Sequence, residues 1–403
     1  MLPVAEAQAR VVAPLRPLAS EWVTLPHGRG RVLAADLRAK RDHPPVAVSA
    51  MDGYAVRAAD TSDADRVFRV VGEAAAGEAA HGPLAAGEAV RIFTGGALPP
   101  GADAIVIQEN AERSGTEVRF RETVAAGRFV RPAGLDFRRD SIGLTAGSLL
   151  DARALGLAAS LGHVWLPVRR RPRIGLLATG NELRWPGETL EGSQIWSSNS
   201  VMLGTMLSAW GAQPVDLGIC PDDGASLAAR VREAGALDVL ATTGGASVGD
   251  YDLVQHVLER EGMRLDFWKI AMRPGKPLLF GRLGEMPVLG FPGNPVSTAV
   301  CSIVFLRMAL QALLGMPLGL RTREAELAHD LDANDGRQDY LRATYEPDTP
   351  CHRIRSAGRQ DSSMLATLAH ADALVVRPPH DPSRRSGETV AIVDLHDALD
   401  SLR

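Results

Sequence analysis

Three acidic residues of this chain each follow a run that is typical of a buried β-strand. Glu182 lies in ATGNEL after RIGLLA, Asp222 lies in CPDD after PVDLGI, and Asp252 lies in TTGGASVGDYD after DVLATTGG. The carboxyl ends of neighbouring parallel strands meet at one edge of a sheet, so we expect the three carboxylates to converge. Mg²⁺ prefers such oxygen ligands, which predicts a Mg²⁺ site. The alternative is that each residue caps a helix or is a solvated loop residue.

Glycine-rich loops complement these carboxylates. In TTGGASVG, successive glycines can turn backbone N–H groups inward to bind an anion, and the helix that follows adds the positive end of its dipole. The loop lacks the Gly-Lys-Ser/Thr of a Walker loop, and a plain glycine-rich turn is the alternative. The predicted contacts with a phosphorylated substrate in this loop and in ATGNEL are Thr179, Gly180, Gly244, Gly245, Ser247 and Gly249.

A basic segment, WKIAMRPGKPLLFG, holds Lys269, Arg273 and Lys276 around a rigid Pro-Gly turn. Cationic side chains held in one turn suit a polyanion or an oxyanion, and arginine favours bidentate phosphate contacts. Ordinary surface charge is the alternative. The stiff turn GFPGNPVS is either a second anion-binding element or simply a sharp turn. Its candidate substrate contacts are Pro292, Gly293, Asn294, Pro295 and Ser297.

Two further motifs stand in the N-terminal half, SAMDGYAVR and RIFTGGALPPGADAIVIQE. Their polar residues Asp52 and Thr94 are candidate ligand contacts. Physical chemistry alone says only that they are polar turn residues of a β-rich domain.

The strand-end motifs require an α/β domain to position them. Strand-like runs alternate with helical stretches predicted at residues 199–210, 226–234, 251–261 and 295–314, and Asn199 can cap the first of these helices. This alternation predicts a doubly wound, mostly parallel sheet. From about Thr322 the pattern alternates with a period of two, which predicts a small domain resembling a β-barrel.

The chain before this α/β domain predicts a different architecture. It begins with an amphipathic helix, and the fragments VFRVV, AVRIF and AIVIQ then predict short strands separated by glycine turns. A second helix is predicted from Asp151 to Gly162, and we expect it to pack on the first. The cluster VRRRPR marks a boundary with the α/β domain.

The composition excludes several classes of protein. The chain has 403 residues, 45% hydrophobic and 23% charged, so disorder cannot dominate. Its length predicts about two to four domains. The net charge of −4 argues against a dedicated nucleic-acid binder. The three cysteines are scattered and the ten histidines never pair at ligand spacing, so neither disulfides nor a zinc site is expected. We expect a cytoplasmic protein without a membrane segment, since the N-terminus lacks a signal-peptide pattern and PGNP interrupts the longest uncharged run.

Taken together, the motifs resemble those of the molybdopterin molybdotransferases, the molybdenum insertases of the MoeA and gephyrin C-terminal-domain family. SAMDGYAVR, RIFTGGALPPGADAIVIQE, ATGNEL, TTGGASVGDYD, RPGKP and FPGNPVS fall in the family's order and approximate spacing, over essentially the whole chain. The resemblance implies a cytoplasmic homodimer that takes adenylylated molybdopterin and molybdate. With Mg²⁺, such enzymes cleave the phosphoanhydride and yield molybdenum cofactor and AMP. Further partners implied are a molybdopterin adenylyltransferase and the chaperones of downstream molybdoenzymes, with no nucleic acid and no membrane.

The resemblance also assigns roles and domains. It makes Glu182, Asp222 and Asp252 the active-site acids, and it matches Lys269, Arg273 and Lys276 to the family's basic loop. It matches Asp52, Thr94 and Asp136 to functional positions that face the partner subunit. The implied domains are an elongated dimerisation domain (1–45 and 140–172), a β-rich insert (46–139), the catalytic α/β domain (173–321) and a C-terminal barrel (322–403).

Several positions depart from the family pattern. Ala47 and Val48 replace a usual Asp-Asn pair, Asn181 and Ser197 each stand where an aspartate is common, and Arg273 replaces a usual lysine. None of these changes removes the three named carboxylates. They leave open a second hypothesis, a catalytically weak paralogue that serves as a molybdopterin-binding carrier or scaffold. An adenylyltransferase is disfavoured, because stand-alone adenylyltransferases lack the N-terminal motifs and the β-rich tail.

Overall fold

The computed structural model describes the chain except residues 64, 79–80, 245–252, 348–352 and 403. Its internal contacts divide the chain into two compact units. The larger unit comprises Met1–Ala35, Ala146–Ala152 and Trp165–Arg403, and the smaller unit comprises Asp36–Thr145 and Arg153–Val164.

The described helices of the larger unit are α1 (Val4–Val12), η1 (Leu25–His27), α3 (Ser198–Ala209), α4 (Gly224–Glu233), α5 (Leu253–Arg260), α6 (Pro295–Cys301), η4 (Ser302–Leu306), α7 (Arg307–Leu314), α8 (Leu365–Ala369) and α9 (Leu395–Asp400). Its strands are β1 (Ser20–Thr24), β12 (Trp165–Arg169), β13 (Arg173–Thr179), β14 (Leu183–Arg184), β15 (Ile195–Trp196), β16 (Gln213–Cys220), β17 (Val239–Thr243), β18 (Met263–Trp268), β19 (Met272–Arg273), β20 (Leu279–Leu283), β21 (Met286–Phe291), β22 (Arg323–Leu327), β23 (Gln338–Tyr345), β24 (Arg353–Ser356), β25 (Ala373–Arg377) and β26 (Thr389–Asp394).

Among its described residues, the smaller unit holds the α-helix α2 (Ala152–Ser160), whose first residue is assigned to the larger unit. It also holds two short 3₁₀ helices, η2 (Ala58–Ser62) and η3 (Gln108–Asn110). Its strands are β2 (Leu37–Arg38), β3 (Val48–Ser49), β4 (Gly53–Val56), β5 (Val67–Ala74), β6 (Glu88–Ile92), β7 (Ala104–Ile107), β8 (Ala111–Ser114), β9 (Glu117–Phe120), β10 (Val130–Arg131) and β11 (Ile142–Leu144).

A six-stranded sheet forms the centre of the larger unit, with strand order β16-β13-β17-β21-β20-β18. The first four strands are parallel, and β20 and β18 run antiparallel to their neighbours. The predicted α/β fold is confirmed. The basic segment, predicted as a Pro-Gly turn, connects the antiparallel strands β18 and β20.

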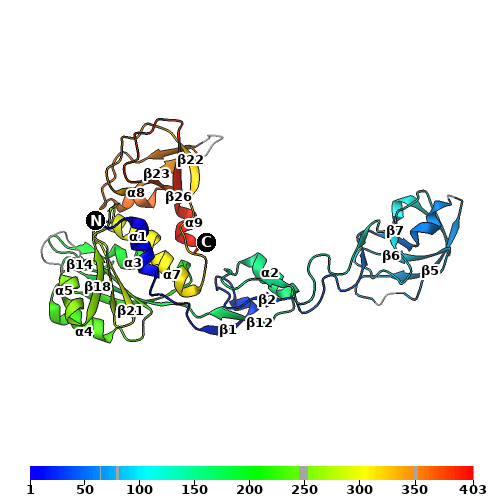
Figure 1. Cartoon of the computed structure of the whole chain (residues 1–403), viewed down its shortest axis with the longest axis horizontal. Coiled ribbons are helices and arrows are strands. Elements are labelled where there is room, and N and C mark those ends of the chain that lie inside the picture. Colours follow the sequence, from blue (N-terminus) through cyan, green and yellow to red (C-terminus); the bar gives the residue numbers. More distant parts are fainter. Residues whose placement is uncertain (64, 79–80, 245–252, 348–352, 403) are drawn as a thin grey trace. The chain divides into compact units, whose positions relative to one another are not determined.

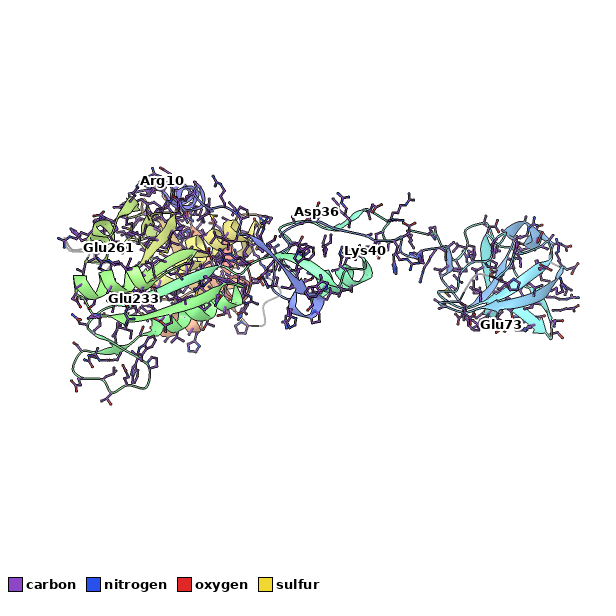
Figure 2. All side chains as sticks on the ribbon, turned by 90° about the horizontal axis from the view of Figure 1, so that it is seen from below. Arg10, Asp36, Lys40, Glu73, Glu233 and Glu261 are labelled. Carbon is purple, nitrogen blue, oxygen red and sulfur yellow. The ribbon has the colours of Figure 1, made fainter. Side chains whose placement is uncertain are left out.

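Helices cover both faces of this sheet, as a doubly wound fold requires. Leu240 of β17 packs with the α4 and α5 side chains in one core cluster, whereas its neighbours Val239 and Ala241 pack with α3, α6 and α7 in another. This alternation follows from the period of two in a strand, since successive side chains point to opposite faces. Figure 2 labels Glu233 and Glu261 near the ends of α4 and α5, where Arg232 binds both carboxylate oxygens of Glu261 at 2.6 and 2.7 Å.

Two of the predicted helix details are wrong. The sequence predicts Asn199 as the cap of α3, but the helix begins at Ser198 and its N-cap is Ser197. The sequence also predicts that the first helix packs on the helix at 151–162. Instead, α1 joins the large core cluster of the α/β sheet, and the Gln8 side chain donates a hydrogen bond to the Val304 carbonyl of η4.

One continuous helical stretch of the described residues, Pro295–Leu314, is long and apolar enough to cross a membrane. It comprises α6, η4 and α7, and most of it is buried within the large core cluster. Such burial is typical of the core helix of a globular protein.

The C-terminal segment forms the predicted barrel. Strands β23, β24, β22, β26 and β25 pair in that order, and an additional β23–β25 pairing closes the cylinder (Figure 1, orange to red). The short strand β19 adds to β23 in parallel, with Arg273 opposite Asp339. This pairing joins the basic segment of the α/β sheet to the barrel.

The smaller unit is built on a second six-stranded sheet, with order β7-β4-β6-β5-β9-β8. The three predicted strand fragments correspond to β5, β6 and β7. Two clusters of buried side chains lie within it, one around Phe68 and Phe120 and the other around Ile92 and Ile105. The β-rich character predicted for this part of the chain is confirmed.

Candidate active site

Glycines mark the carboxyl ends of three adjacent parallel strands in the larger unit. Gly180 follows β13, Gly244 follows β17, and Gly293 lies two residues beyond β21. Gly244 has a φ of +93°, and a Cβ added to it would lie 2.1 Å from the carbonyl oxygen of Thr179. A Cβ on Gly293 would lie 3.6 Å from the Cα of Gly244. The three strand ends therefore approach so closely that Gly244 admits no side chain.

Two of the predicted acids lie at this edge. The carboxylate of Glu182 folds over Gly180, since a Cβ on that glycine would lie 2.6 Å from Glu182 Oε2. The exposed Asp222 is joined to the end of β13 by reciprocal hydrogen bonds. The Asn181 N–H donates to Asp222 Oδ2 (3.2 Å), and the Asp222 N–H donates to Asn181 Oδ1 (3.1 Å).

The third predicted acid, Asp252, lies outside the described residues, together with Gly245, Ser247 and Gly249. Within the described part of the chain, no group of three or more His, Cys, Asp or Glu side chains could hold a metal ion. The carboxylates of Glu182 and Asp222 offer oxygen ligands at this edge. A further oxygen is the buried Thr179 Oγ1, which has no hydrogen-bond partner among the described residues.

A cavity of about 650 Å³ opens beside these strand ends. The predicted site residues that line it are Glu182, Gly244, Arg273, Lys276, Pro292, Gly293, Asn294 and Ser297. The other predicted residues that the structure describes in this unit lie outside its lining; they are Thr179, Gly180, Asp222, Lys269 and Pro295. The structure thus brings one acid, two basic residues and the stiff FPGNP turn to a single space.

The barrel supplies a further wall that the sequence does not predict. Its lining residues are Arg337, Gln360, Asp361 and Ser362. Ser362 holds this wall to the FPGNP turn, because its Oγ accepts a hydrogen bond from Asn294 Nδ2 (2.7 Å) and its carbonyl accepts one from the Val296 N–H (3.1 Å). The only local signal in the sequence is the polar stretch GRQDSS.

Arg273 lines the cavity and also binds residues of the barrel. Its Nε donates to Asp339 Oδ2 at 2.9 Å, and its guanidinium also donates to Asn334 Oδ1 at 3.2 Å. Burial raises the pKa of Asp339, while the bond from Arg273 opposes that rise. The charge of Arg273 is therefore offset by a buried partner.

The two lysines of the basic segment lie in different surroundings. Lys276 lines the cavity, and its side chain has no hydrogen bond or ion pair to any residue that the structure describes. Lys269 Nζ lies 3.6 Å from the centre of the Trp268 ring, a cation–π contact outside the cavity lining. The remaining lining cation, Arg337, binds Asp335 at 2.6 Å, and this hydrogen bonding lowers the pKa of Asp335 to about 2.

Asn199 is a site residue that the sequence assigns to the wrong role. From the first turn of α3 its Nδ2 donates to Thr243 Oγ1 (2.8 Å) and to the Gly293 carbonyl (2.8 Å). It thereby connects the end of β17 to the FPGNP turn. An asparagine near the start of a helix can either cap the helix or contact the neighbouring sheet. The sequence alone does not distinguish these two roles.

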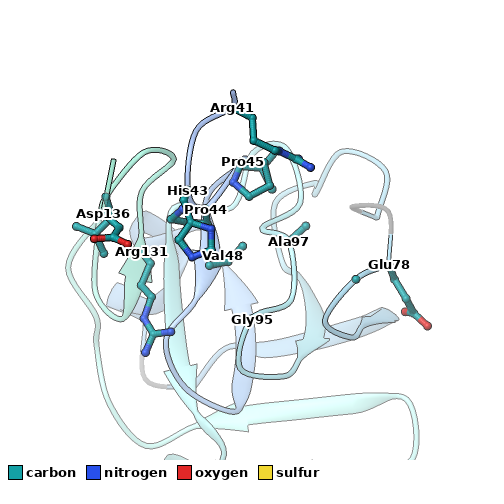
Figure 3. Close-up of a pocket in the computed structure, with 13 residues that line it drawn as sticks. Arg41, His43, Pro44, Pro45, Val48, Glu78, Gly95, Ala97, Arg131 and Asp136 are labelled. Carbon is teal, nitrogen blue, oxygen red and sulfur yellow. The ribbon is translucent and has the colours of Figure 1, made fainter. Parts of the chain in front are cut away.

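The predicted residues of the smaller unit fall into two places. Thr94 donates to Asp52 Oδ1 from its backbone N–H (2.7 Å) and from its hydroxyl (2.8 Å). Both bonds favour the ionised carboxylate, so they lower the pKa of Asp52. Asp136 lines a separate cavity of about 670 Å³ whose walls also include His43, Val48 and Arg131 (Figure 3).

We expect Thr94→Val to raise the pKa of Asp52, because the variant loses the hydroxyl donor but keeps the backbone donor. A carboxyl group with a lowered pKa stabilises the folded state above its unfolded-state pKa, and this contribution disappears as the pH falls through its folded-state pKa. The variant should therefore lose less stability on acidification than the parent protein. NMR titration of the Asp52 carboxyl carbon measures the shift. Thr123→Val, whose hydroxyl donates to the Thr61 carbonyl, is the control; an unchanged Asp52 pKa in Thr94→Val would contradict the assignment.

Comparison with family models matches three successive regions of the chain. Residues 2–162 match the MoeA N-terminal region (domain I and II), residues 175–312 match a probable molybdopterin binding domain, and residues 324–395 match the MoeA C-terminal region (domain IV). The three matches cover both units.

Full-length proteins also match this chain over nearly its whole length. The chain is 35% identical to molybdopterin molybdenumtransferase 2 of Mycobacterium tuberculosis, over 98% of this chain and 100% of that protein. It is 32% identical to the molybdopterin molybdenumtransferase of Bacillus subtilis, over 97% and 94%. Among solved structures, the molybdopterin biosynthesis MoeA protein of Pyrococcus horikoshii is 28% identical and superposes with a TM-score of 0.85, over 97% of this chain and 99% of that chain.

Proposed function

Since the chain belongs to the molybdopterin molybdenumtransferase (MoeA) family, we propose that it inserts molybdenum from molybdate into adenylylated molybdopterin, with Mg²⁺-dependent release of AMP. The observation that carries the proposal is the cavity at the strand ends. There Glu182 and Lys276, which has no partner among the described residues, line one space beside Gly244 and the FPGNP turn. The cavity therefore offers a carboxylate for a metal–phosphate group and an ammonium group for an oxyanion.

The carboxylate oxygens at the strand ends are of the kind that Mg²⁺ binds. This ion is usually held by one or two carboxylates together with substrate phosphates, and it retains several waters. Glu182 and Asp222 supply carboxylates next to Gly180, and Asp252 stays a predicted third ligand. When bound, the ion would neutralise charge on the substrate's pyrophosphate.

The chain's own residues have complementary tasks in this proposal. Gly244 and Gly293 leave backbone exposed where the phosphates would lie, and the two hydrogen bonds of Asn199 join Thr243, next to Gly244, to Gly293. Gly245, Ser247 and Gly249 stay predicted phosphate contacts. Catalysis in such a site consists mainly of positioning and charge neutralisation.

Molybdate would bind at Lys276, whose ammonium has no counter-ion among the described residues. Arg273 would act by holding the basic segment on the barrel through Asp339, and Ser362 and Gln360 would form the facing wall. Lys269 stays a predicted oxyanion contact. The dithiolene sulfurs that capture molybdenum belong to the substrate, so no protein cysteine is required.

The departure at Asn181 is compatible with turnover. Its side-chain oxygen accepts the Asp222 N–H, a task that an aspartate oxygen would perform equally well. The substitution therefore preserves the contact between the ends of β13 and β16 while removing one negative charge.

Reconstitution tests the proposed activity. Purified protein with adenylylated molybdopterin, molybdate and Mg²⁺ should activate an apo-molybdoenzyme, and omission of molybdate should abolish activation. If the protein binds the pterin but never activates the acceptor, the carrier hypothesis replaces the enzyme.

We also propose that the protein is a cytoplasmic homodimer. Trp22 and Trp165 occupy alternate positions on one face of the β1–β12 ribbon, and they are 66% and 55% exposed. Exposed aromatic surface of this kind is typical of protein interfaces. Sedimentation should give twice the 42.9 kDa mass of the chain, and a Trp22→Glu, Trp165→Glu double variant should shift to monomer. A parent protein that is monomeric at micromolar concentration would refute the dimer.

A further inference from the structure

Trp196 presents an indole ring on the short β14–β15 ribbon, which begins directly after the cavity-lining Glu182. It lies in β15, and the residue is 52% exposed. Its Nε1 donates to the Glu188 carbonyl at 3.0 Å. The turn that carries Glu188 is itself closed, because Glu188 Oε2 accepts a hydrogen bond from the Trp185 N–H (2.7 Å) and the Glu188 N–H donates to the Trp185 carbonyl (3.1 Å). The half-exposed indole is therefore anchored by a hydrogen bond to a closed turn.

The backbone around Trp196 is continuous with the site. The Ile195 N–H donates to the carbonyl of Glu182, and the Ser197 N–H donates to the carbonyl of Arg184, each at 2.8 Å. Directly after Ser197, α3 begins and brings Asn199 to Thr243 and Gly293. The backbone around Trp196 thus connects to two residues of the site, the cavity-lining Glu182 on one side and Asn199 on the other.

Arg184 and Ile195, the neighbouring side chains of the ribbon, are directed away from the Trp196 ring. Arg184 lies opposite Trp196 in the parallel ribbon, so the two side chains leave on the same face. The Arg184 guanidinium donates to the carbonyls of Asn181 (3.1 Å) and Leu183 (2.7 Å) and so turns back toward the strand-end loop. Ile195 leaves on the opposite face of the ribbon.

We propose that Trp196 is a stacking platform for a planar nitrogen heterocycle of the substrate. This inference rests on the proposed function, since adenylylated molybdopterin carries a pterin at one end of its pyrophosphate and adenine at the other. A fixed indole loses little conformational freedom on stacking. Stacking of a base on an aromatic side chain strengthens binding by about 5- to 150-fold.

Calorimetry with three probes tests the platform on the full-length protein. The probes are AMP, a free 6-substituted pterin, and ribose 5-phosphate, which has no ring. Trp196→Ala should weaken AMP or the pterin by about 5- to 150-fold and leave ribose 5-phosphate unchanged. The affected probe identifies which ring stacks. Trp196→Phe keeps a π-face and should restore most of the affinity.

Ile195→Ala is the matched control, because Ile195 is 53% exposed and adjacent in sequence but lies on the other face. It should bind all three probes as the parent does. The platform is overturned if Trp196→Ala binds both ring-bearing probes like the parent, if the parent binds neither, or if ribose 5-phosphate weakens to the same extent. Cofactor formation by the parent protein is measured in parallel. If the parent protein forms cofactor but Trp196→Ala binds the ring-bearing probes normally, only the stacking proposal is refuted. If Trp196→Ala weakens a ring-bearing probe but the parent protein forms no cofactor, only the proposed function is refuted.

Discussion

Replacing Asp222 with alanine is expected to slow AMP release by ~10²-fold or more, because the Mg²⁺ site loses a carboxylate ligand. The fold should change little. The Asp222 side chain is exposed, and among the described residues it accepts a hydrogen bond from the Asn181 N–H at 3.2 Å. Single-turnover release of AMP over a range of Mg²⁺ concentrations measures the effect, and extra Mg²⁺ should restore part of the rate.

Asp223→Ala is the matched control for this variant. The neighbouring Asp223 is also exposed, but its carboxylate caps α4 by accepting hydrogen bonds from the N–H groups of Ala225 and Ser226. Its loss should lower the stability of the fold, because the helix loses its N-cap, with little effect on turnover. Asp222→Ala should show the reverse pattern. Normal turnover of Asp222→Ala at low Mg²⁺ would show that the acid is structural and that the metal assignment fails.

Lys276→Ala should weaken the use of molybdate by roughly 10- to 150-fold. A charge-assisted hydrogen bond contributes ~1.5–3 kcal/mol, and about 1.4 kcal/mol corresponds to a factor of ten. The reason lies in the cavity, where Lys276 is the lining cation without a described counter-ion, while Arg273 and Arg337 bind carboxylates. Binding of the pterin should fall less, since backbone groups at the strand ends stay in place.

A molybdate titration of cofactor formation measures this effect, with pterin binding measured on the same preparations. Lys269→Ala is the comparison, because the Lys269 ammonium lies over the Trp268 ring and outside the cavity lining. A loss of equal size in Lys269→Ala would place both lysines at the oxyanion. An unchanged molybdate dependence in Lys276→Ala would move the oxyanion elsewhere.

The strand-end part of the site could be predicted from sequence for a physical reason. A buried parallel strand leaves a continuous apolar run, and the residues just beyond it must lie at the sheet edge. Glu182, Gly244 and Gly293 were therefore accessible from local patterns. The antiparallel strands β18 and β20 were missed because proline and charged residues in the segment between them resemble a loop.

The barrel wall of the cavity could not be predicted in this way. Gln360 and Ser362 reach the site because β19 pairs with β23, and no local period encodes a pairing between strands so far apart in sequence. The partner of Arg273 depends on the same pairing. Similarly, the amphipathic pattern of α1 shows that one face is buried but not which helix covers it, and the observed contact joins Gln8 to Val304.

Simultaneous measurement of AMP release and molybdenum incorporation tests the central claim most directly. Purified protein is given adenylylated molybdopterin and Mg²⁺, and molybdate is varied from zero to saturation. The account predicts that AMP appears in equal amount to pterin-bound molybdenum, and that both depend on molybdate with the same half-saturation. Tight retention of intact adenylylated molybdopterin at saturating molybdate and Mg²⁺, with neither AMP nor bound molybdenum formed, would contradict it and identify a carrier.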